Sequence, residues 1–221
     1  MKDSNLFWVD TTYSPQAAED VLRWIKKKFG KRKIIAINTH FHIDRIGGNA
    51  ALIKHGIPVY GSEEIAKLLK ERGPAMRKLM LKETKNSPEL YKYYKTAVFT
   101  PPDHPFPLSI GLMMTSGGES ARVMFKGEGH SPDNMVVYFP DRMLLVGGCM
   151  ILAGKTVGNT ADANMDEWSK SIEAIRDYGY KFKYVIPGHG DSTSPDLIQH
   201  TLDVLAKYQK KAKKKKEDTD E

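Results

Sequence analysis

The chain has 221 residues, of which 40% are hydrophobic, and a formal net charge of +7. This length and composition are typical of one well-buried globular domain. A single cysteine excludes an internal disulfide, so cysteine pairing gives no indication of the redox compartment. No apolar run approaches the roughly 20 residues that a transmembrane helix needs, and we expect no signal peptide ahead of Asn5.

Strand and helix signals alternate along the chain, which predicts an α/β fold. Ser14 and Pro15 indicate the start of a first helix, as cap and first-turn proline. Short β-branched or apolar runs predict strands, and amphipathic runs predict helices. The expected strands are 34–37, 59–60 and 121–125, and the further helices are 62–72, 74–85, 168–175 and 197–211, with an irregular segment over 87–107.

The most informative motif, NTHFHIDRIGGN, follows the strand expected at 34–37. In an extended segment alternate side chains point the same way, so we expect His40, His42 and Asp44 to share one face. Two imidazoles and a carboxylate are ligands for first-row metals, with zinc the leading candidate. The alternative is a polar loop with capping roles, but three donors at a period of two favour a metal.

Three further donors follow apolar runs and lie beside glycines. His130 lies in GEGHSPDN, Cys149 in MLLVGGCM and His189 in YVIPGHG. An α/β scaffold presents side chains in this way at the edge of a sheet, with backbone room for a ligand. Taken singly, a buried cysteine is usually a small hydrophobe and a histidine near a turn is usually surface. Taken together, the donors favour a metal site.

The motifs HFHIDR, GEGHSPDN, LLVGGC, GNTADAN and VIPGHG occur in this order between about residues 5 and 207. In order and spacing the chain resembles the metallo-β-lactamases, specifically the dizinc subclass that uses a cysteine in its second site. The resemblance implies an αββα sandwich and two Zn²⁺ ions. The implied ligands are His40, His42 and His130 for the first zinc, and Asp44, Cys149 and His189 for the second.

Two positions distinguish this chain from other hydrolases that resemble it. Thioesterase-like and nucleic-acid-cleaving relatives have a further histidine where this chain has Arg45, and an aspartate bridges their metals where this chain has Cys149. Arginine is cationic and has no acceptor, so Arg45 cannot ligate a metal. Arg45 and Cys149 together favour a lactamase-like site over a thioesterase-like one.

The resemblance implies a hydrolase that opens the β-lactam ring with a metal-bound hydroxide oriented by Asp44. Asn159 matches the substrate-binding asparagine of the family, although a turn or cap role is equally expected. Leu152 occupies the position where most members of the subclass have a lysine that binds the substrate carboxylate. Lys155 is a candidate for that role, and an ordinary solvated lysine is the alternative. Alternative functions are hydrolysis of another ester, a lactone or a thioester, and non-enzymatic zinc binding.

We expect a metallo-β-lactamase-like domain over residues 1–206, without the N-terminal strands and hairpin of the family. Residues 207–221 contain seven lysines and four acids, which predicts a disordered tail. The resemblance implies a periplasmic or secreted protein, a role in antibiotic resistance and a small-molecule β-lactam as the partner. We expect no nucleic-acid partner and no membrane span, and the sequence sets no oligomeric state.

Overall fold

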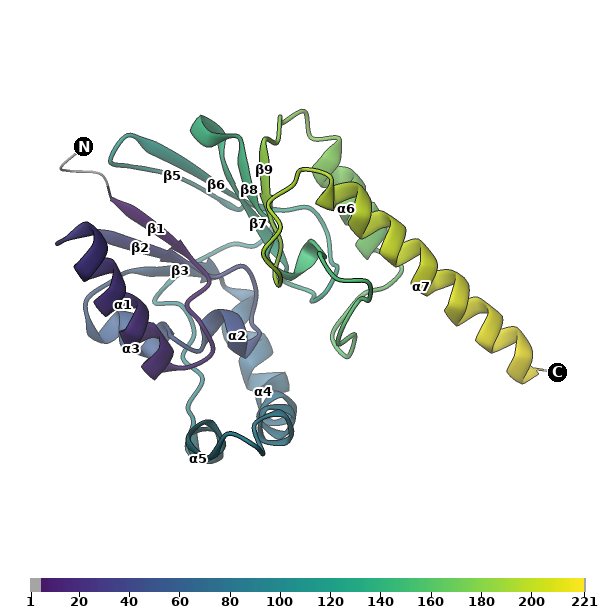
Figure 1. The fold of residues 1–221 in the computed structure, drawn as a ribbon, viewed down its shortest axis with the longest axis horizontal. Coiled ribbons are helices and arrows are strands. Elements are labelled where there is room, and N and C mark those ends of the chain that lie inside the picture. Colours follow the sequence, from purple (N-terminus) through teal and green to yellow (C-terminus); the bar gives the residue numbers. More distant parts are fainter. Residues whose placement is uncertain (1–4, 221) are drawn as a thin grey trace. The chain divides into compact units, whose positions relative to one another are not determined.

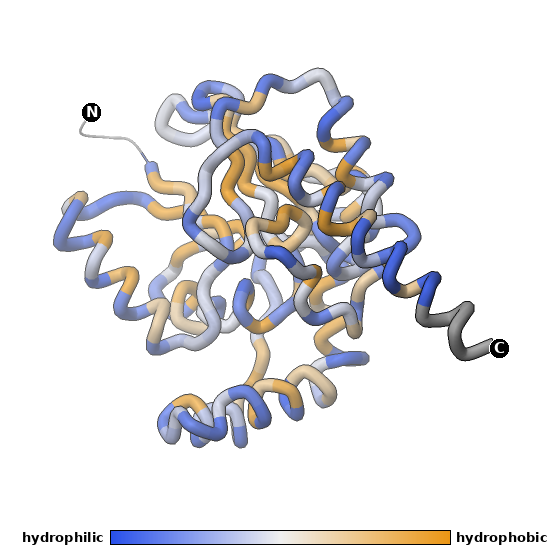
Figure 2. The backbone as a smooth tube through the Cα atoms, turned by 45° about the vertical axis from the view of Figure 1, so that its right-hand side comes forward, coloured by the Kyte–Doolittle hydropathy of each residue, from blue (hydrophilic) through white to orange (hydrophobic). Residues whose placement is uncertain are grey.

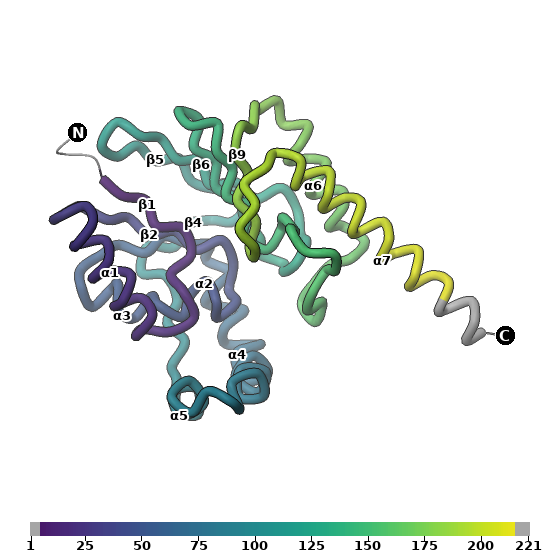
Figure 3. Tube along the Cα trace, in the orientation of Figure 1, coloured from purple at the N-terminus to yellow at the C-terminus, as the bar shows by residue number. Residues whose placement is uncertain are grey.

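The computed structural model describes the backbone of residues 5–220 and the side chains through residue 214. The chain divides into two compact units at residues 108 and 109. The ribbon in Figure 1 and the tube in Figure 3 follow both units from purple to yellow. The expected single domain over residues 1–206 stays a prediction, and each unit is described by itself.

Unit 1 is built on a parallel sheet in the order β1-β2-β3-β4. Parallel neighbours require crossover connections, and helices supply them here. The strands are β1 (Leu6–Val9), β2 (Ile34–Ile37), β3 (Val59–Ser62) and β4 (His104–Phe106). The helices are α1 (Pro15–Phe29), α2 (Ile43–Ile46), α3 (Asn49–Lys54), α4 (Glu64–Glu83) and α5 (Pro88–Thr96).

Helix α1 begins where the sequence predicted. The Ser14 hydroxyl accepts a hydrogen bond from the Ala17 amide at 3.2 Å, and Pro15 occupies the first turn. α1 packs beside α3 and shares with it a core of Ala18, Ala36, Ala51, Leu52 and Val59 (Figure 1). Gly48 permits the close approach of the backbone before α1, since a Cβ there would lie 1.8 Å from the Thr11 carbonyl oxygen.

A second core in unit 1 lies between α2, α4 and α5 around the buried ring of Tyr94. The Tyr94 hydroxyl donates to the Tyr13 carbonyl at 2.6 Å. Arg77 of α4 donates to the carbonyls of Tyr94 at 3.2 Å and Ala97 at 2.6 Å. These bonds satisfy carbonyls at the end of α5, which lack partners within the helix.

Two expectations for this part of the chain are wrong. The helices expected at 62–72 and 74–85 form one helix, α4, with Pro74 inside it. Tertiary packing of Ile65, Leu68 and Met76 offsets the loss of one backbone hydrogen bond at the proline. The segment expected to be irregular contains α5 and β4, and Ser87 followed by Pro88 is the start signal that marks α5.

Unit 2 contains a sheet in the order β5-β6-β7-β8-β9, antiparallel except for the parallel pair β8–β9. The strands are β5 (Leu112–Ser116), β6 (Glu119–Phe125), β7 (Met135–Phe139), β8 (Leu144–Val146) and β9 (Tyr184–Ile186). Short 3₁₀ helices, η1 (Pro140–Arg142) and η2 (Gly148–Met150), flank β8. The expected strand at 121–125 is confirmed as part of β6.

Helices α6 (Trp168–Arg176) and α7 (Leu197–Asp220) pack together in unit 2. Trp168 is fully buried in their shared core, and its indole donates to the Met150 carbonyl at 3.0 Å. α7 extends past residue 211, where the sequence predicted its end, while Glu221 lies outside the described residues. Among the described residues, no helix combines the length and apolar character needed to cross a bilayer.

Candidate metal centre

Three donors converge in unit 1 at the end of β2. His40 follows the strand, His42 is the N-cap of α2, and Asp44 lies in the first turn of α2. One ligand atom of each lies within 4.8 Å of the others, and His40 Nε2 is 3.2 Å from His42 Nδ1. His40 is fully buried, whereas His42 and Asp44 are partly exposed. The donors therefore share one face, as the sequence predicted.

The backbone brings these donors together by a different route from the one expected. The segment is not extended as far as Asp44, because α2 begins directly after His42. The helical turn, and not strand alternation, returns the Asp44 carboxylate toward the imidazoles. Gly47 and Gly48 then lead directly into α3.

A hydrogen-bond chain behind His40 fixes its tautomer. The Thr39 hydroxyl lies 3.0 Å from His40 Nδ1 and donates to Asp10 Oδ2 at 3.1 Å. Because the hydroxyl hydrogen points to Asp10, the hydroxyl oxygen accepts the proton on His40 Nδ1. His40 Nε2, which faces His42, then carries the lone pair that a metal requires. Thr39 and Asp10 were not singled out from the sequence.

Asp10 and Asp44 are linked by a guanidinium group. Arg45 lies 3.7 Å from Asp10 Oδ2 and 2.9 Å from Asp44 Oδ2, so one cation serves two carboxylates. Burial raises the pKa of the Asp10 carboxyl from 3.8 to about 6, while Arg45 opposes this rise. The Thr39 amide also donates to Asp10 Oδ1, at 2.8 Å. Arg45 thus positions carboxylates and is not itself a ligand.

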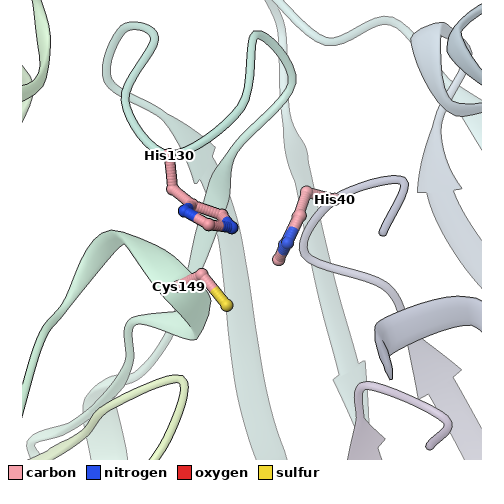
Figure 4. Close-up of side chains that lie close together, drawn as sticks. All are labelled: His40, His130 and Cys149. Atoms are coloured by element: carbon pink, nitrogen blue, oxygen red, sulfur yellow. The ribbon is translucent and has the colours of Figure 1, made fainter. Parts of the chain in front are cut away.

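Unit 2 holds a second group of donors. Cys149 lies in η2 and is 5% exposed, and its Sγ is 3.6 Å from Nε2 of His189, which follows β9. Gly188 allows this approach, since a Cβ there would lie 2.7 Å from Cys149 Cα. In Figure 4 the side chains of His130 and Cys149 point toward the same space. Thiolate and imidazole are donors that zinc accepts.

Hydrogen bonds shape the loop that carries His130. The Ser131 amide donates to Asn134 Oδ1 at 2.7 Å, and the Ser131 hydroxyl donates to Asp133 Oδ1 at 2.8 Å. All three residues are buried. The His130 ring packs edge-to-face near Trp168, with ring centroids 5.6 Å apart. The polar residues of GEGHSPDN therefore fix the backbone from which the imidazole projects.

The two candidate substrate-binding residues are exposed. Asn159 Oδ1 accepts a hydrogen bond from the Ala161 amide at 3.0 Å, which is the turn role considered from the sequence. Lys155 lies in the same connection, between η2 and α6. Leu152 packs against the core of unit 2. The roles of Asn159 and Lys155 toward a substrate stay predictions.

The family description "Metallo-beta-lactamase superfamily" matches residues 7–189. The chain is 32% identical over 203 residues to a metallo-beta-lactamase type 2 of Bacillus cereus, covering 90% of this chain and 68% of that protein. A protein of the same name from Bacteroides fragilis is 27% identical over 202 residues, covering 90% and 70%.

Solved structures give the same result. A metallo-beta-lactamase from Pontibacter korlensis superimposes with a TM-score of 0.76 at 30% identity, covering 92% of this chain and 83% of that chain. The metallo-beta-lactamase IND-7 gives a TM-score of 0.74 at 25% identity, covering 92% and 82%. The α/β fold, with its two sheets and His, Asp and Cys donors, is that of a metal-dependent hydrolase. The chain belongs to the metallo-beta-lactamase superfamily, which confirms the resemblance found in its motifs.

Proposed function

We propose that the chain hydrolyses the β-lactam ring with two zinc ions. The observation that carries the proposal is the convergence of His40, His42 and Asp44 in a chain related to metallo-beta-lactamases type 2. The first zinc would be held by three imidazoles, and the second by a carboxylate, a thiolate and an imidazole. The proposed ligands are His40, His42 and His130 for the first ion, and Asp44, Cys149 and His189 for the second.

The chemistry of the donors fits this assignment. Three neutral imidazoles form the ligand set of a catalytic zinc, which keeps an open fourth position. The hydrogen bond from His40 Nδ1 to Thr39 puts the imidazole lone pair on Nε2, as expected where a neighbouring group orients a ligating histidine. The 3.6 Å separation of Cys149 Sγ and His189 Nε2 suits two donors to one ion.

When bound, zinc lowers the pKa of a coordinated water to about 7 and polarises a carbonyl. The chain's own residues would orient the water and bind the substrate. The Asp44 carboxylate, which pairs with Arg45 at 2.9 Å, would accept a hydrogen bond from the attacking water and orient it. Because the Asn159 carbonyl oxygen is engaged by Ala161, its amide hydrogens remain for the lactam carbonyl or the substrate carboxylate. Lys155 would bind that carboxylate in place of the lysine absent at Leu152.

Hydrolysis of another ester, a lactone or a thioester is the nearest alternative, since it would use the same donors. A non-enzymatic zinc-binding protein is the alternative from a different class. By its resemblance to the family, we further propose a periplasmic or secreted location and a contribution to antibiotic resistance.

Metal analysis coupled to a hydrolysis assay tests the proposal. The protein dialysed against zinc should hold two equivalents and should turn over nitrocefin faster than neutral lactones or thioesters. Cys149→Ser should retain about one equivalent and lose most activity, because the second ion loses its thiolate. His42→Asn should lower the zinc content, because the first ion loses a proposed ligand. His55→Asn, which changes an exposed histidine in unit 1, is the matched control and should leave the zinc content unchanged.

Three results would contradict this reading. No more than one equivalent of zinc would refute the dizinc assignment. Turnover of lactones or thioesters without turnover of nitrocefin would favour the alternative hydrolase. Full zinc content with no turnover of any of these substrates would favour a binding protein.

A further inference from the structure

The C-terminal end of α1 and the loop that follows it form a strongly basic segment. Residues 23–33, RWIKKKFGKRK, hold seven basic residues and no acid; we call this segment the α1 tip. The chain has 34 basic residues, so the 27 outside the α1 tip equal the 27 acidic residues in number. The α1 tip therefore has a formal charge of +7, and the charges of the rest of the chain sum to zero.

The α1 tip also exposes two large aromatic rings. Trp24 is 52% exposed and Phe29 is 39% exposed. Their rings pack edge-to-face with centroids 5.6 Å apart, and Lys28 Nζ lies 5.1 Å and 5.7 Å from the two centroids. Around this pair, the lysines of the α1 tip are exposed, namely Lys26, Lys27, Lys28, Lys31 and Lys33.

The rings are not needed for the core of unit 1, because other residues of α1 fill it. Ala18 and Ile25 are the buried residues of α1. Along the α1 trace, hydrophilic and hydrophobic residues alternate (Figure 2). Arg32 donates to the Phe29 carbonyl at 3.0 Å and so closes the turn after the helix. The structure thus presents an ordered surface of rings and cations that packing alone does not explain.

We propose that the α1 tip binds the surface of a bilayer that contains anionic phospholipid. Tryptophan, with an apolar ring and a polar N–H, favours the headgroup level of a membrane, and lysines beside it attract anionic headgroups. Each basic residue near such a surface strengthens binding about fivefold. The attachment is peripheral and does not require a transmembrane helix. It goes beyond the proposed hydrolytic function and does not depend on it.

The arrangement of the rings favours lipid over single-stranded nucleic acid, which also attracts cations. Nucleic-acid platforms stack successive bases on open aromatic faces. In the α1 tip, Trp24 and Phe29 pack edge-to-face against one another, and the Lys28 ammonium lies over both rings. Such a cluster suits insertion among headgroups better than base stacking.

Co-sedimentation of the full zinc-loaded chain with vesicles tests the proposal. The protein should bind vesicles of mixed phosphatidylcholine and phosphatidylglycerol, and should bind vesicles of phosphatidylcholine alone far more weakly. Tryptophan emission should shift to the blue on binding, and Trp24→Phe should abolish most of that shift. The double variant Lys27→Gln/Lys31→Gln should weaken binding by about 25-fold, at about fivefold for each charge.

A matched control distinguishes the effect of charges in the α1 tip from the effect of the net charge of the chain. The double variant Lys78→Gln/Lys82→Gln removes two exposed charges from α4 and should bind vesicles like the unaltered chain. Trp24→Ala/Phe29→Ala should weaken binding at least tenfold while leaving zinc content and circular dichroism unchanged, since both rings lie outside the cores. Three results would overturn the proposal. The α4 control could lose as much vesicle binding as the α1 tip variants, or the protein could bind both kinds of vesicle equally. The third is tighter binding to a single-stranded oligonucleotide than to anionic vesicles at the same salt concentration.

Discussion

The hydroxyl of Thr39 offers a direct test of how the metal centre is positioned. Thr39 is fully buried, and its hydroxyl connects His40 Nδ1 at 3.0 Å to Asp10 Oδ2 at 3.1 Å. Thr39→Val keeps the shape of the side chain but removes both hydrogen bonds. Asp10 would retain two partners, namely the backbone amide of residue 39 at 2.8 Å and the guanidinium group of Arg45 at 3.7 Å. The fold should therefore survive, while the His40 ring loses the group that fixes its tautomer.

Loss of such an orienting partner typically weakens metal binding by about 10- to 100-fold, or about 1.4–2.7 kcal/mol. We expect a loss in this range for the zinc of the three-imidazole site, for which His40 is a proposed ligand. Competition with a chromogenic zinc chelator measures the affinity, and Thr39→Ser should restore most of it by returning the hydroxyl.

Thr84→Val is the matched control. Its hydroxyl donates to the Met80 carbonyl at 2.6 Å, at the end of α4, so its loss should lower the free energy of unfolding without changing zinc affinity. The reasoning fails if Thr39→Val binds zinc like the unaltered chain. It also fails if both valine variants lose affinity equally, since that would indicate general destabilisation.

Three further outcomes are expected. Lys155→Ala should lower kcat/KM for β-lactams by roughly tenfold, about 1.4 kcal/mol of charge-assisted binding, and should spare neutral lactones; equal losses on both would assign Lys155 to loop structure. Tyr94→Phe should lower the free energy of unfolding in urea by about 1–3 kcal/mol, because the Tyr13 carbonyl loses its 2.6 Å donor; an unchanged midpoint would show that water replaces the hydroxyl. Burial raises the pKa of Asp10 from 3.8 to about 6, so its proton binds the native state more tightly than the unfolded chain. The stability of metal-free protein relative to Asp10→Asn should therefore fall, by on the order of 3 kcal/mol, as pH rises from about 4 to about 6, and a pH-independent difference would argue against the raised pKa.

The sequence predicted the donors of unit 1 because their spacing is local. His40, His42 and Asp44 lie within five residues, so any compact path after β2 brings them together. The path itself was not predicted, since the choice between extended chain and a short helix at α2 depends on tertiary packing of Ile43 and Ile46. The same packing allows α4 to continue through Pro74, against its local preference.

Asp10 was missed because its role depends on strand pairing. β1 and β2 are parallel neighbours in a register that pairs Val9 with Ile37, and only this register places Asp10 beside Thr39. An aspartate after a strand is common, and no local pattern connects Asp10 with a motif about 30 residues away. An explicit search for polar residues after every parallel strand could have found it.

Cys149 is the sole thiol in the chain. Any sulfhydryl-specific reagent therefore labels one position. The fraction of intact chains that carry the added mass measures how accessible that thiol is. If Cys149 ligates zinc, the ion should shield it, so the rate of alkylation becomes an inverse measure of metal occupancy. Such footprinting would follow gain and loss of the metal without a substrate, and would do so even in variants that no longer turn over.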